Sequence, residues 1–371
     1  MNPTRLGRLM EAEMRDQPRV LAALADRFTS IGAAVAALFA ADTPRDAGPM
    51  AERLGGGGVA SGSAPLPNGP VGVAFLARGS SDNAALLGRY AVELQTGLPT
   101  CLVAPSVATI YGREPVGFRG WLLIALSQSG RTPEIVDLTR RYAAAGAKVV
   151  AVTNDPDSAL ARAAHYTVAL EAGPERAVPA TKTVSGQMLA VLAIASGLGP
   201  GGMTRREAAE LPAAAADLLA DTAAVAPAAE LIATVDRVAV VGRGACYPAA
   251  LETALKLQET TGIMAHGFSS ADFRHGPIAV TGPGAPAVLL AGSGPADTDT
   301  LALREPLAAR YAPTVLAGTA TEAPITWPAR GHLGECVLAT IRGQQLALAV
   351  ARELGIDADH PSGLAKVTLT H

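Results

Sequence analysis

Two stretches of this chain resemble each other when the sequence is shifted by 165 residues, from position 78 to position 243. The shift places ARGSSDNAALLGRYAVELQTG over GRGACYPAALETALKLQETTG. The identical pairs include Arg78 and Arg243, Gly79 and Gly244, Ala84 and Ala249, Ala85 and Ala250, Leu86 and Leu251, Thr96 and Thr261, and Gly97 and Gly262. Self-similarity of this length indicates an internal duplication, so we expect the chain to build one supersecondary unit twice.

Short apolar runs alternate with helical segments in each copy. The run VGVAFLA is followed by a helical segment near 83–96, then by WLLIALS, a second helical segment near 133–145, and KVVAVTN; the pattern restarts at RVAVVGRG. Strands separated by helices of this length predict right-handed βαβ units and a parallel sheet. The 371 residues are enough for two domains of about 150 residues each plus end segments. The expected fold class is therefore α/β with two tandem domains.

The segments outside the duplication have their own signals. Residues 1–40 carry apolar residues at helical spacing, and Pro18 marks a break or a new start, so we expect two N-terminal helices. Residues 41–70 are rich in Gly, Pro and Ser, with four successive glycines at 55–58, and are expected to form a mobile loop. The predicted boundaries are then 71–205 for the first domain, 206–354 for the second, and 355–371 for a C-terminal tail.

Composition restricts the setting and the partners of the chain. Hydrophobic residues make up 49% and charged residues 17%, which favours a compact chain with a large core. A formal net charge of −3 with interspersed signs argues against nucleic acid as a partner. Cys101, Cys246 and Cys336 are far apart, which fits neither a disulfide framework nor a metal site and favours a reducing cytoplasm. We recognise no signal peptide and no membrane span.

Two strand-to-helix turns in the first copy are rich in hydroxyl groups. One follows the strand that ends at Ala77; the other precedes Pro133, a residue favoured in the first turn of a helix. Their polar residues are Gly79, Ser80 and Ser81 in the first turn, and Ser127, Gln128, Ser129 and Thr132 in the second. Backbone N–H groups and hydroxyls at helix N-termini bind phosphate well, so both turns together suggest one shared anion. The alternative is that these side chains merely cap their helices.

Ionisable residues distinguish the second copy from the first. Glu252, Lys256 and Glu259 are separated by four and three residues, so one helix face carries all three. The corresponding residues of the first copy are Leu87, Ala91 and Leu94. An exposed helix with salt bridges is the usual meaning of Glu and Lys four residues apart. The apolar residues around the trio favour a buried functional face instead.

Two further candidates lie in loops. The segment HGFSSADFRHGP contains His275, followed by a Gly-Pro pair that favours a turn. The C-terminal HPSGLAKVTLTH contains Lys366 after Pro361 and Gly363, a composition typical of a shaped loop. Taken alone, His275 would be a structural hydrogen-bonding residue and Lys366 a surface lysine.

Taken together, these segments resemble the sugar isomerase (SIS) domain family. The resemblance is carried by RGSSDNAA, SQSGRTPEIVD, EAGPERAVPATKT, GRGACYPAALETALKLQET, DFRHGP and PSGLAKVT, in the family's order and with compatible spacing. It extends from about Glu13 to the C-terminus. The chain is most similar to the isomerase half of glutamine:fructose-6-phosphate amidotransferase and to stand-alone glucosamine-6-phosphate deaminases. The resemblance implies two flavodoxin-like three-layer domains, each with a parallel five-stranded sheet between helices.

The resemblance also implies roles for the candidate residues. Glu259 matches the family's proton-transfer base, His275 the residue that assists ring opening, and Lys366 the lysine that forms a Schiff base with an open-chain ketose. Glu252 and Lys256 match a supporting polar network. The residues implied to bind the sugar phosphate are Gly79, Ser80, Ser81, Ser127, Gln128, Ser129 and Thr132, with Val178 and Ala365 against the sugar. Neither metal nor cofactor is implied.

The resemblance further implies a homodimer, because the family's ring-opening histidine comes from the neighbouring subunit. The sequence departs from the family at Arg176 and Pro179, close to Val178. It has helical segments at the start, where the amidotransferases carry a glutaminase domain, so glutamine is not expected to be the ammonia source within this chain.

The leading functional prediction is a glucosamine-6-phosphate deaminase that forms fructose 6-phosphate and ammonia. The alternatives on the same scaffold are ammonia-dependent glucosamine-6-phosphate synthesis and cleavage of a fructosamine phosphate. A non-catalytic sugar-phosphate sensor is an alternative of another class, disfavoured because every implied catalytic position is occupied.

Overall fold

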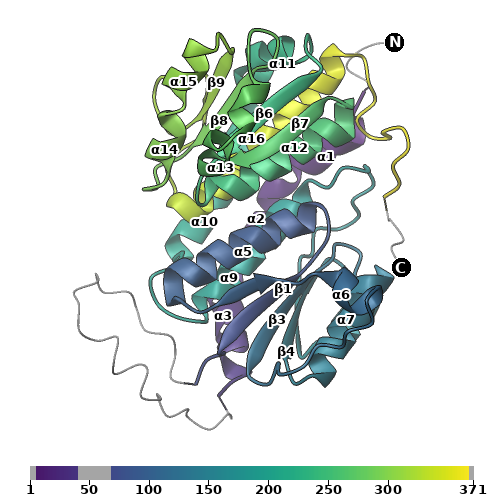
Figure 1. The fold of residues 1–371 in the computed structure, drawn as a ribbon. Helices are drawn as coiled ribbons and strands as arrows, with labels where there is room; N and C mark the ends of the chain where they lie inside the picture. The colour runs from purple at the N-terminus through teal and green to yellow at the C-terminus, as the bar shows by residue number, and fades with distance from the viewer. Residues whose placement is uncertain (1–5, 41–67, 367–371) are drawn as a thin grey trace, which may run out of the picture.

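The computed structural model describes residues 6–40 and 68–366 (Figure 1). Most of the Gly-rich loop expected at 41–70 lies outside the described residues. The chain forms two α/β units, shown in blue and green in Figure 1, and both contain a five-stranded sheet in which all strands are parallel. The predicted fold class is therefore confirmed.

The two sheets have the same topology. In the first sheet the order is β2-β1-β3-β4-β5, and in the second it is β10-β9-β8-β6-β7, which is the same arrangement of consecutive strands. This is the order of flavodoxin-like folds, in which the chain reverses direction across the sheet after its first strand. The strands are β1 (Gly72–Leu76), β2 (Thr100–Leu102), β3 (Trp121–Leu126), β4 (Lys148–Thr153), β5 (Tyr166–Ala169), β6 (Arg237–Gly242), β7 (Met264–Ser269), β8 (Ala287–Ala291), β9 (Thr314–Gly318) and β10 (Ile325–Thr326).

Helices cover both faces of each sheet. The helices of the first unit are α5 (Ser80–Thr96), α6 (Pro105–Thr109), α7 (Pro133–Ala144), α8 (Ala159–Ala163) and α9 (Lys182–Ser196). The second unit adds α10 (Arg205–Ala220), η2 (Ala223–Val225), α11 (Ala226–Ile232), α12 (Cys246–Thr261), α13 (Ser270–Arg274), η3 (Pro277–Val280), α14 (Asp297–Leu301), α15 (Arg304–Ala309) and α16 (His332–Glu353). The expected domain boundary at 205/206 falls at the start of α10, which packs against both the N-terminal helices and α16.

The largest core lies between the two sheets. Alternate residues of β1 point to opposite sides: Val73 and Phe75 join this shared core, while Ala74 and Leu76 face the smaller core under α7. Helices α5 and α9 of the first unit and α12 and α16 of the second pack on one another within the shared core. The two units are thus joined through their inner helices, and α5 lies against α12.

Three N-terminal helices are present, so the expectation of two was wrong. They are α1 (Arg8–Arg15), α2 (Gln17–Asp26) and α3 (Phe28–Ala37). Pro18 lies in the first turn of α2, as its restricted backbone favours. The additional break is at Arg27, where the chain bends by 50° and the guanidinium donates to the carbonyls of Ala23 and Ala169. Because of this bend, α2 and α3 can both bury apolar residues against α9.

Two expectations concern the setting of the protein. Within residues 6–40 and 68–366, no single helix is long and apolar enough to cross a membrane; α1–α2 and α3 meet the criteria as a bent pair, and their apolar residues Val20, Leu21 and Leu24 are buried in the core. The three cysteines are free thiols, with Cys246 and Cys336 buried and Cys101 partly buried.

The two ends of the described chain are tied together. Asp359 in the tail accepts hydrogen bonds from the backbone N–H groups of Leu9 and Met10, at 2.9 and 2.8 Å, and Asp357 accepts one from Gly7 at 3.1 Å. From there the yellow tail leaves the second unit and runs toward the first (Figure 1). The tail therefore carries Lys366 across the boundary between the units.

Candidate functional site

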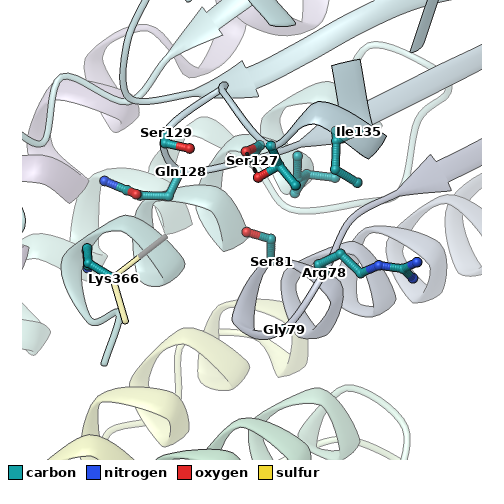
Figure 2. Close-up of a pocket in the computed structure, with 10 residues that line it drawn as sticks. Arg78, Gly79, Ser81, Ser127, Gln128, Ser129, Ile135 and Lys366 are labelled. Atoms are coloured by element: carbon teal, nitrogen blue, oxygen red, sulfur yellow. Dashed lines mark hydrogen bonds between the residues drawn. The ribbon is translucent and has the colours of Figure 1, made fainter. Parts of the chain in front are cut away.

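The two hydroxyl-rich turns meet at one edge of the first sheet. They follow β1 and β3, which are neighbours, and the chain leaves β1 toward β2 on one side while β3 continues the sheet on the other. Ligands of open α/β sheets bind at such a switch point, outside the carboxyl ends of the strands. A cavity of about 330 Å³ lies there, lined by Arg78, Gly79, Ser81, Leu126, Ser127, Gln128, Ser129, Thr132, Ile135 and Lys366 (Figure 2).

The local backbone explains how these turns form an anion cradle. Gly79 has a φ of 58° and directly precedes α5, so the first turn of that helix opens toward the cavity. In the second turn, Ser127 Oγ accepts from Gly130 N at 3.2 Å and lies 3.5 Å from Thr132 Oγ1. Thr132 is the N-cap of α7 but makes no side-chain cap hydrogen bond. Helix capping therefore does not account for Thr132, and the arrangement suits a phosphate group.

Basic residues stand on opposite sides of the cavity. Lys366 lies on one side and Arg78 on the other, with Ser81 between them (Figure 2). The Arg78 guanidinium donates to Glu134 Oε2 through Nε and Nη2, at 3.1 and 2.9 Å. Arg78 was not among the predicted site residues, although it belongs to the repeated RG pair.

The predicted trio on α12 is buried at the contact between α12 and α5. The Glu252 and Lys256 side chains are 1% and 0% exposed and that of Glu259 is 22% exposed, so the alternative of an exposed salt-bridged helix is wrong. Lys256 Nζ donates to Ser80 Oγ at 3.0 Å and to Glu259 Oε2, and lies 3.5 Å from Glu252 Oε1. Asn83 of α5 donates to Glu252 Oε2 at 2.7 Å. The hydroxyl-rich turn after β1 of one unit thus contacts the ionisable face of the other.

The charges within the trio follow from burial and pairing. Burial acts to lower the pKa of Lys256, but the two adjacent carboxylates outweigh it and raise this pKa, so the amine remains an ammonium. Burial raises the pKa of Glu252, against the attraction of Lys256. Glu259 is the carboxylate of the trio with the greatest access to solvent. It therefore has the accessibility that a proton-transfer group needs.

Lys366 reaches the cavity wall through a buried carboxylate. Its Nζ donates to Glu175 Oε2 at 2.9 Å, and the Glu175 side chain is 0% exposed. Glu175 also accepts from Thr181 N, Thr183 N and Thr183 Oγ1, at 3.0, 3.1 and 2.7 Å. Burial alone would raise the pKa of Glu175, but Lys366 and the Thr183 hydroxyl hold it below its usual value.

The remaining predicted residues lie in different surroundings. Val178 N donates to Asp359 O at 3.1 Å, so the loop before α9 is joined to the tail. Ala365 is exposed beside Lys366. His275, at the C-terminal end of α13, is exposed and is not among the residues that line the cavity of its own chain.

Several residues of this site were missed by the sequence analysis, namely Glu13, Arg78, Asn83, Glu134 and Glu175. Glu175 and Asn83 lie within the motifs that carried the family resemblance, but no spacing rule marks them, because their partners are far away in the sequence. Among the described residues no group of three or more His, Cys, Asp or Glu side chains could hold a metal ion.

The chain matches the model of a known protein family. The model of the SIS domain matches residues 72–197 and 231–322. Glutamine–fructose-6-phosphate aminotransferase (isomerizing) of Zymomonas mobilis is 34% identical over 312 residues, which is 79% of this chain and 51% of that protein. The same enzyme of Symbiobacterium thermophilum is 36% identical over 314 residues. The chain spans about half the length of the curated relatives it matches.

The fold is also similar to those of solved structures. A proposed phosphosugar isomerase from Silicibacter pomeroyi is 28% identical, with a TM-score of 0.78 over 95% of this chain and 99% of that one. A glucosamine-6-phosphate deaminase from Thermotoga maritima has a TM-score of 0.72 over 98% of this chain and 100% of that one. At 21% identity, the latter shows the shared fold alone.

Proposed function

The chain belongs to the SIS domain family, and from this premise we propose that it is an enzyme that deaminates a phosphorylated amino sugar, with glucosamine 6-phosphate as substrate and fructose 6-phosphate and ammonia as products. The observation that carries the proposal is the hydrogen bond of Lys256 to both Ser80 and Glu259. It connects the phosphate-binding turn of one unit to a proton-transfer carboxylate of the other.

The cradle would hold the substrate's phosphate. Ser81, Ser127 and Thr132 line the cavity, and the N-termini of α5 and α7 open at the same edge of the sheet. Hydroxyls and backbone N–H groups at helix N-termini favour a dianion. With the phosphate held there, the carbons at the other end of the open-chain sugar would extend toward the space between Glu259 and Lys366.

The proposed chemistry moves one carbon-bound proton and releases one amino group. After ring opening, Glu259 takes the proton from C2 and returns it to C1, while a proton passes through solvent from the C2 amine to the aldehyde oxygen, so that C1 becomes an alcohol and C2 a ketimine. Lys366 displaces ammonia from C2 by forming its own Schiff base, and water then hydrolyses this bond to release the ketose and the free lysine. The sum is glucosamine 6-phosphate plus water giving fructose 6-phosphate plus ammonia.

The hydrolytic direction is favoured because water can reach the partly exposed Glu259 and Lys366 from bulk solvent. A second candidate is the reverse reaction, ammonia-dependent synthesis of glucosamine 6-phosphate. It is favoured by the curated relatives, which are named aminotransferases. Both directions use the same residues in the same roles.

Ring opening is assigned to His275 of the partner subunit, in a homodimer with shared sites. The exposure of His275 and its absence from the lining of its own cavity support this arrangement. Mixing two inactive variants, His275→Ala and Glu259→Gln, should restore activity, because a heterodimer regains one intact site. An active monomer by light scattering, or mixtures that stay inactive after subunit exchange, would contradict the shared site.

The test of the function is a product assay. Purified protein is incubated with glucosamine 6-phosphate in the absence of glutamine, and ammonia and fructose 6-phosphate are both measured, with Glu259→Gln as the control. We expect equal amounts of the two products and a loss of about 10²–10⁴-fold in the control. Fructose 6-phosphate consumed with added ammonia, without the forward reaction, would favour synthesis. Binding of the sugar phosphate without turnover in either direction would indicate a sensor.

A further inference from the structure

A buried carboxylate holds the C-terminal lysine against the pocket. Glu175 lies in the loop between β5 and α9, far from Lys366 in the sequence, and the two side chains meet at 2.9 Å. We propose that Glu175 is the positioning residue of Lys366: its carboxylate fixes the amine at the cavity wall, where C2 of the substrate would reach it, and pairs with the positive charge on the nitrogen. This inference rests on the proposed function, because that function gives Lys366 its chemical role.

The charge of Glu175 does not depend on Lys366 alone. Oε1 accepts from the backbone N–H groups of Thr181 and Thr183, where α9 begins, and Oε2 accepts from the Thr183 hydroxyl. Helix N-termini favour negative charge, and α9 extends from Lys182 to Ser196. The carboxylate is therefore held in its charged form by these hydrogen bonds together with Lys366. It acts as a fixed counter-charge on the rigid side of the pair.

Lys366, by contrast, lies on the exposed side of the pair. After Asp359, which is fixed to α1, residues 362–365 are exposed. The hydrogen bond to Glu175 brings this exposed stretch back to the first unit. The backbone bond from Val178 to Asp359 joins the same loop to the same tail. Loop and tail are thus fastened to each other at two points.

Other charged groups face this pair from the neighbouring helices. Glu13 of α1 accepts from the backbone N–H groups of Arg176 and Ala177, directly after Glu175, and its pKa is raised by burial and by Glu175. Lys256 of α12 is close enough for Glu175 to contribute to its raised pKa. Glu13 thus supports the loop, and Lys256 adds a positive charge beyond it.

The pairing has a consequence for the chemistry. A lysine adds to a carbonyl as the neutral amine, so the ammonium first releases a proton to solvent. With fructose 6-phosphate, addition gives a neutral carbinolamine, and when its hydroxyl leaves as water, with a proton taken from solvent, the Schiff base keeps one proton on nitrogen and carries a positive charge. Glu175 then faces this charge and stabilises it. Glu175 therefore supports the charged intermediate once it forms.

The experiment measures Schiff-base formation directly. The full-length protein is mixed with fructose 6-phosphate between pH 5 and 10 and treated with borohydride, and modified Lys366 is quantified by mass spectrometry. In Glu175→Gln we expect the pH midpoint of trapping to fall by about one unit or more, because an opposite charge within hydrogen-bond distance is lost. Glu175→Asp, which keeps the charge one methylene further away, should give an intermediate midpoint. Glu171→Gln, an exposed carboxylate of the same loop that pairs with Arg27, should leave the midpoint unchanged.

The outcomes separate this inference from the proposed function. Equal midpoints in the wild type and in a Glu175→Gln protein that still melts cooperatively and binds fructose 6-phosphate would overturn the positioning role alone. A Glu175→Asp midpoint between those of the wild type and Glu175→Gln would support it. Trapping absent from the wild type at every pH, despite bound sugar phosphate, would overturn the role of Lys366 in the proposed function and the inference with it.

Discussion

The loops after the equivalent strands β3 and β8 differ between the two units. After β3, the first unit carries Ser127, Ser129 and Thr132 around an open cavity. After β8, the equivalent strand of the second unit, the corresponding positions are Gly292, Gly294 and Asp297. There the protein's own carboxylates occupy the loop.

Glu335, in the first turn of α16, also contacts the loop after β8 through its carboxylate. Glu335 accepts from Ser293 N at 2.7 Å, from Ser293 Oγ at 2.6 Å and from Arg330 N at 3.2 Å. Asp297 accepts from Gly294 N at 2.8 Å. A Cβ in place of the Gly292 hydrogen would collide with Oε2 of Glu335, so this loop has no room for a side chain at the position that Ser127 occupies in the first unit.

The difference shows how the two copies of a duplicated fold can diverge. In the second unit, backbone N–H groups and the Ser293 hydroxyl donate to carboxylates of the protein itself, whereas in the first unit the loop lines an open cavity. The ionisable residues of the helices are distributed the other way: α12 carries the trio, while α5 has Leu87, Ala91 and Leu94 at these positions. One unit thus presents the hydroxyl-lined cavity and the other the ionisable trio, and the two features meet where α5 packs against α12.

The largest effect is expected from replacing Lys256 of α12 by alanine, the residue found at the corresponding position, Ala91, of α5. Lys256→Ala leaves two carboxylates, one of them fully buried, without their ammonium, so we expect a loss of about 3–5 kcal/mol of unfolding free energy by urea denaturation. The triple change Glu252→Leu, Lys256→Ala and Glu259→Leu removes the whole trio. It should recover most of that stability while remaining inactive.

Two results would contradict an electrostatic coupling within the trio. One is a loss of less than about 1 kcal/mol of unfolding free energy in Lys256→Ala. The other is a triple variant that is no more stable than Lys256→Ala.

The second largest effect is expected from placing a carboxylate at Thr132 of the first unit, the position that corresponds to Asp297 in the second. Thr132→Asp introduces the residue found at Asp297 and sets a negative charge against the sugar phosphate. Since like charges brought together cost several kcal/mol, calorimetry with fructose 6-phosphate should show affinity reduced by about 100-fold or more. Thr132→Asn is the neutral control of the same shape and should lose about 10-fold or less. Similar losses in the two variants would show that shape, rather than charge, decides binding.

The smallest effect is expected from removing the Glu335 carboxylate from the loop after β8. Glu335→Ala leaves the N–H groups of Ser293 and Arg330 without their acceptor, at an expected cost of about 1–3 kcal/mol. Inorganic phosphate should then raise the melting temperature of this variant by several degrees more than that of the wild type. In Glu335→Gln the side chain still fills the space, so phosphate should have no such effect. A phosphate response equal in all three proteins would contradict the equivalence of the two loops.

Sequence reasoning succeeded where a feature depends on neighbouring residues. The spacing of Glu252, Lys256 and Glu259 indicated a shared helix face, and the structure buries that face. The turns at Ser81 and at Ser127 were expected to serve one anion, and they line one cavity. It failed at Arg27, because a bend that depends on the carbonyl of Ala169 has no local signal.

The sequence by itself determined the duplication, the parallel α/β units, the positions of the two turns and the face of α12. These follow from periodicity and from turn chemistry, which act over a few residues. Only the tertiary structure decided that Asn83 bonds Glu252, that Glu175 holds Lys366, and that Glu335 fills the second loop. The partners in the first two of these pairs are 169 and 191 residues apart. Such pairs form because the packing of α5 on α12 and the path of the tail bring charges together, and no local pattern encodes that packing.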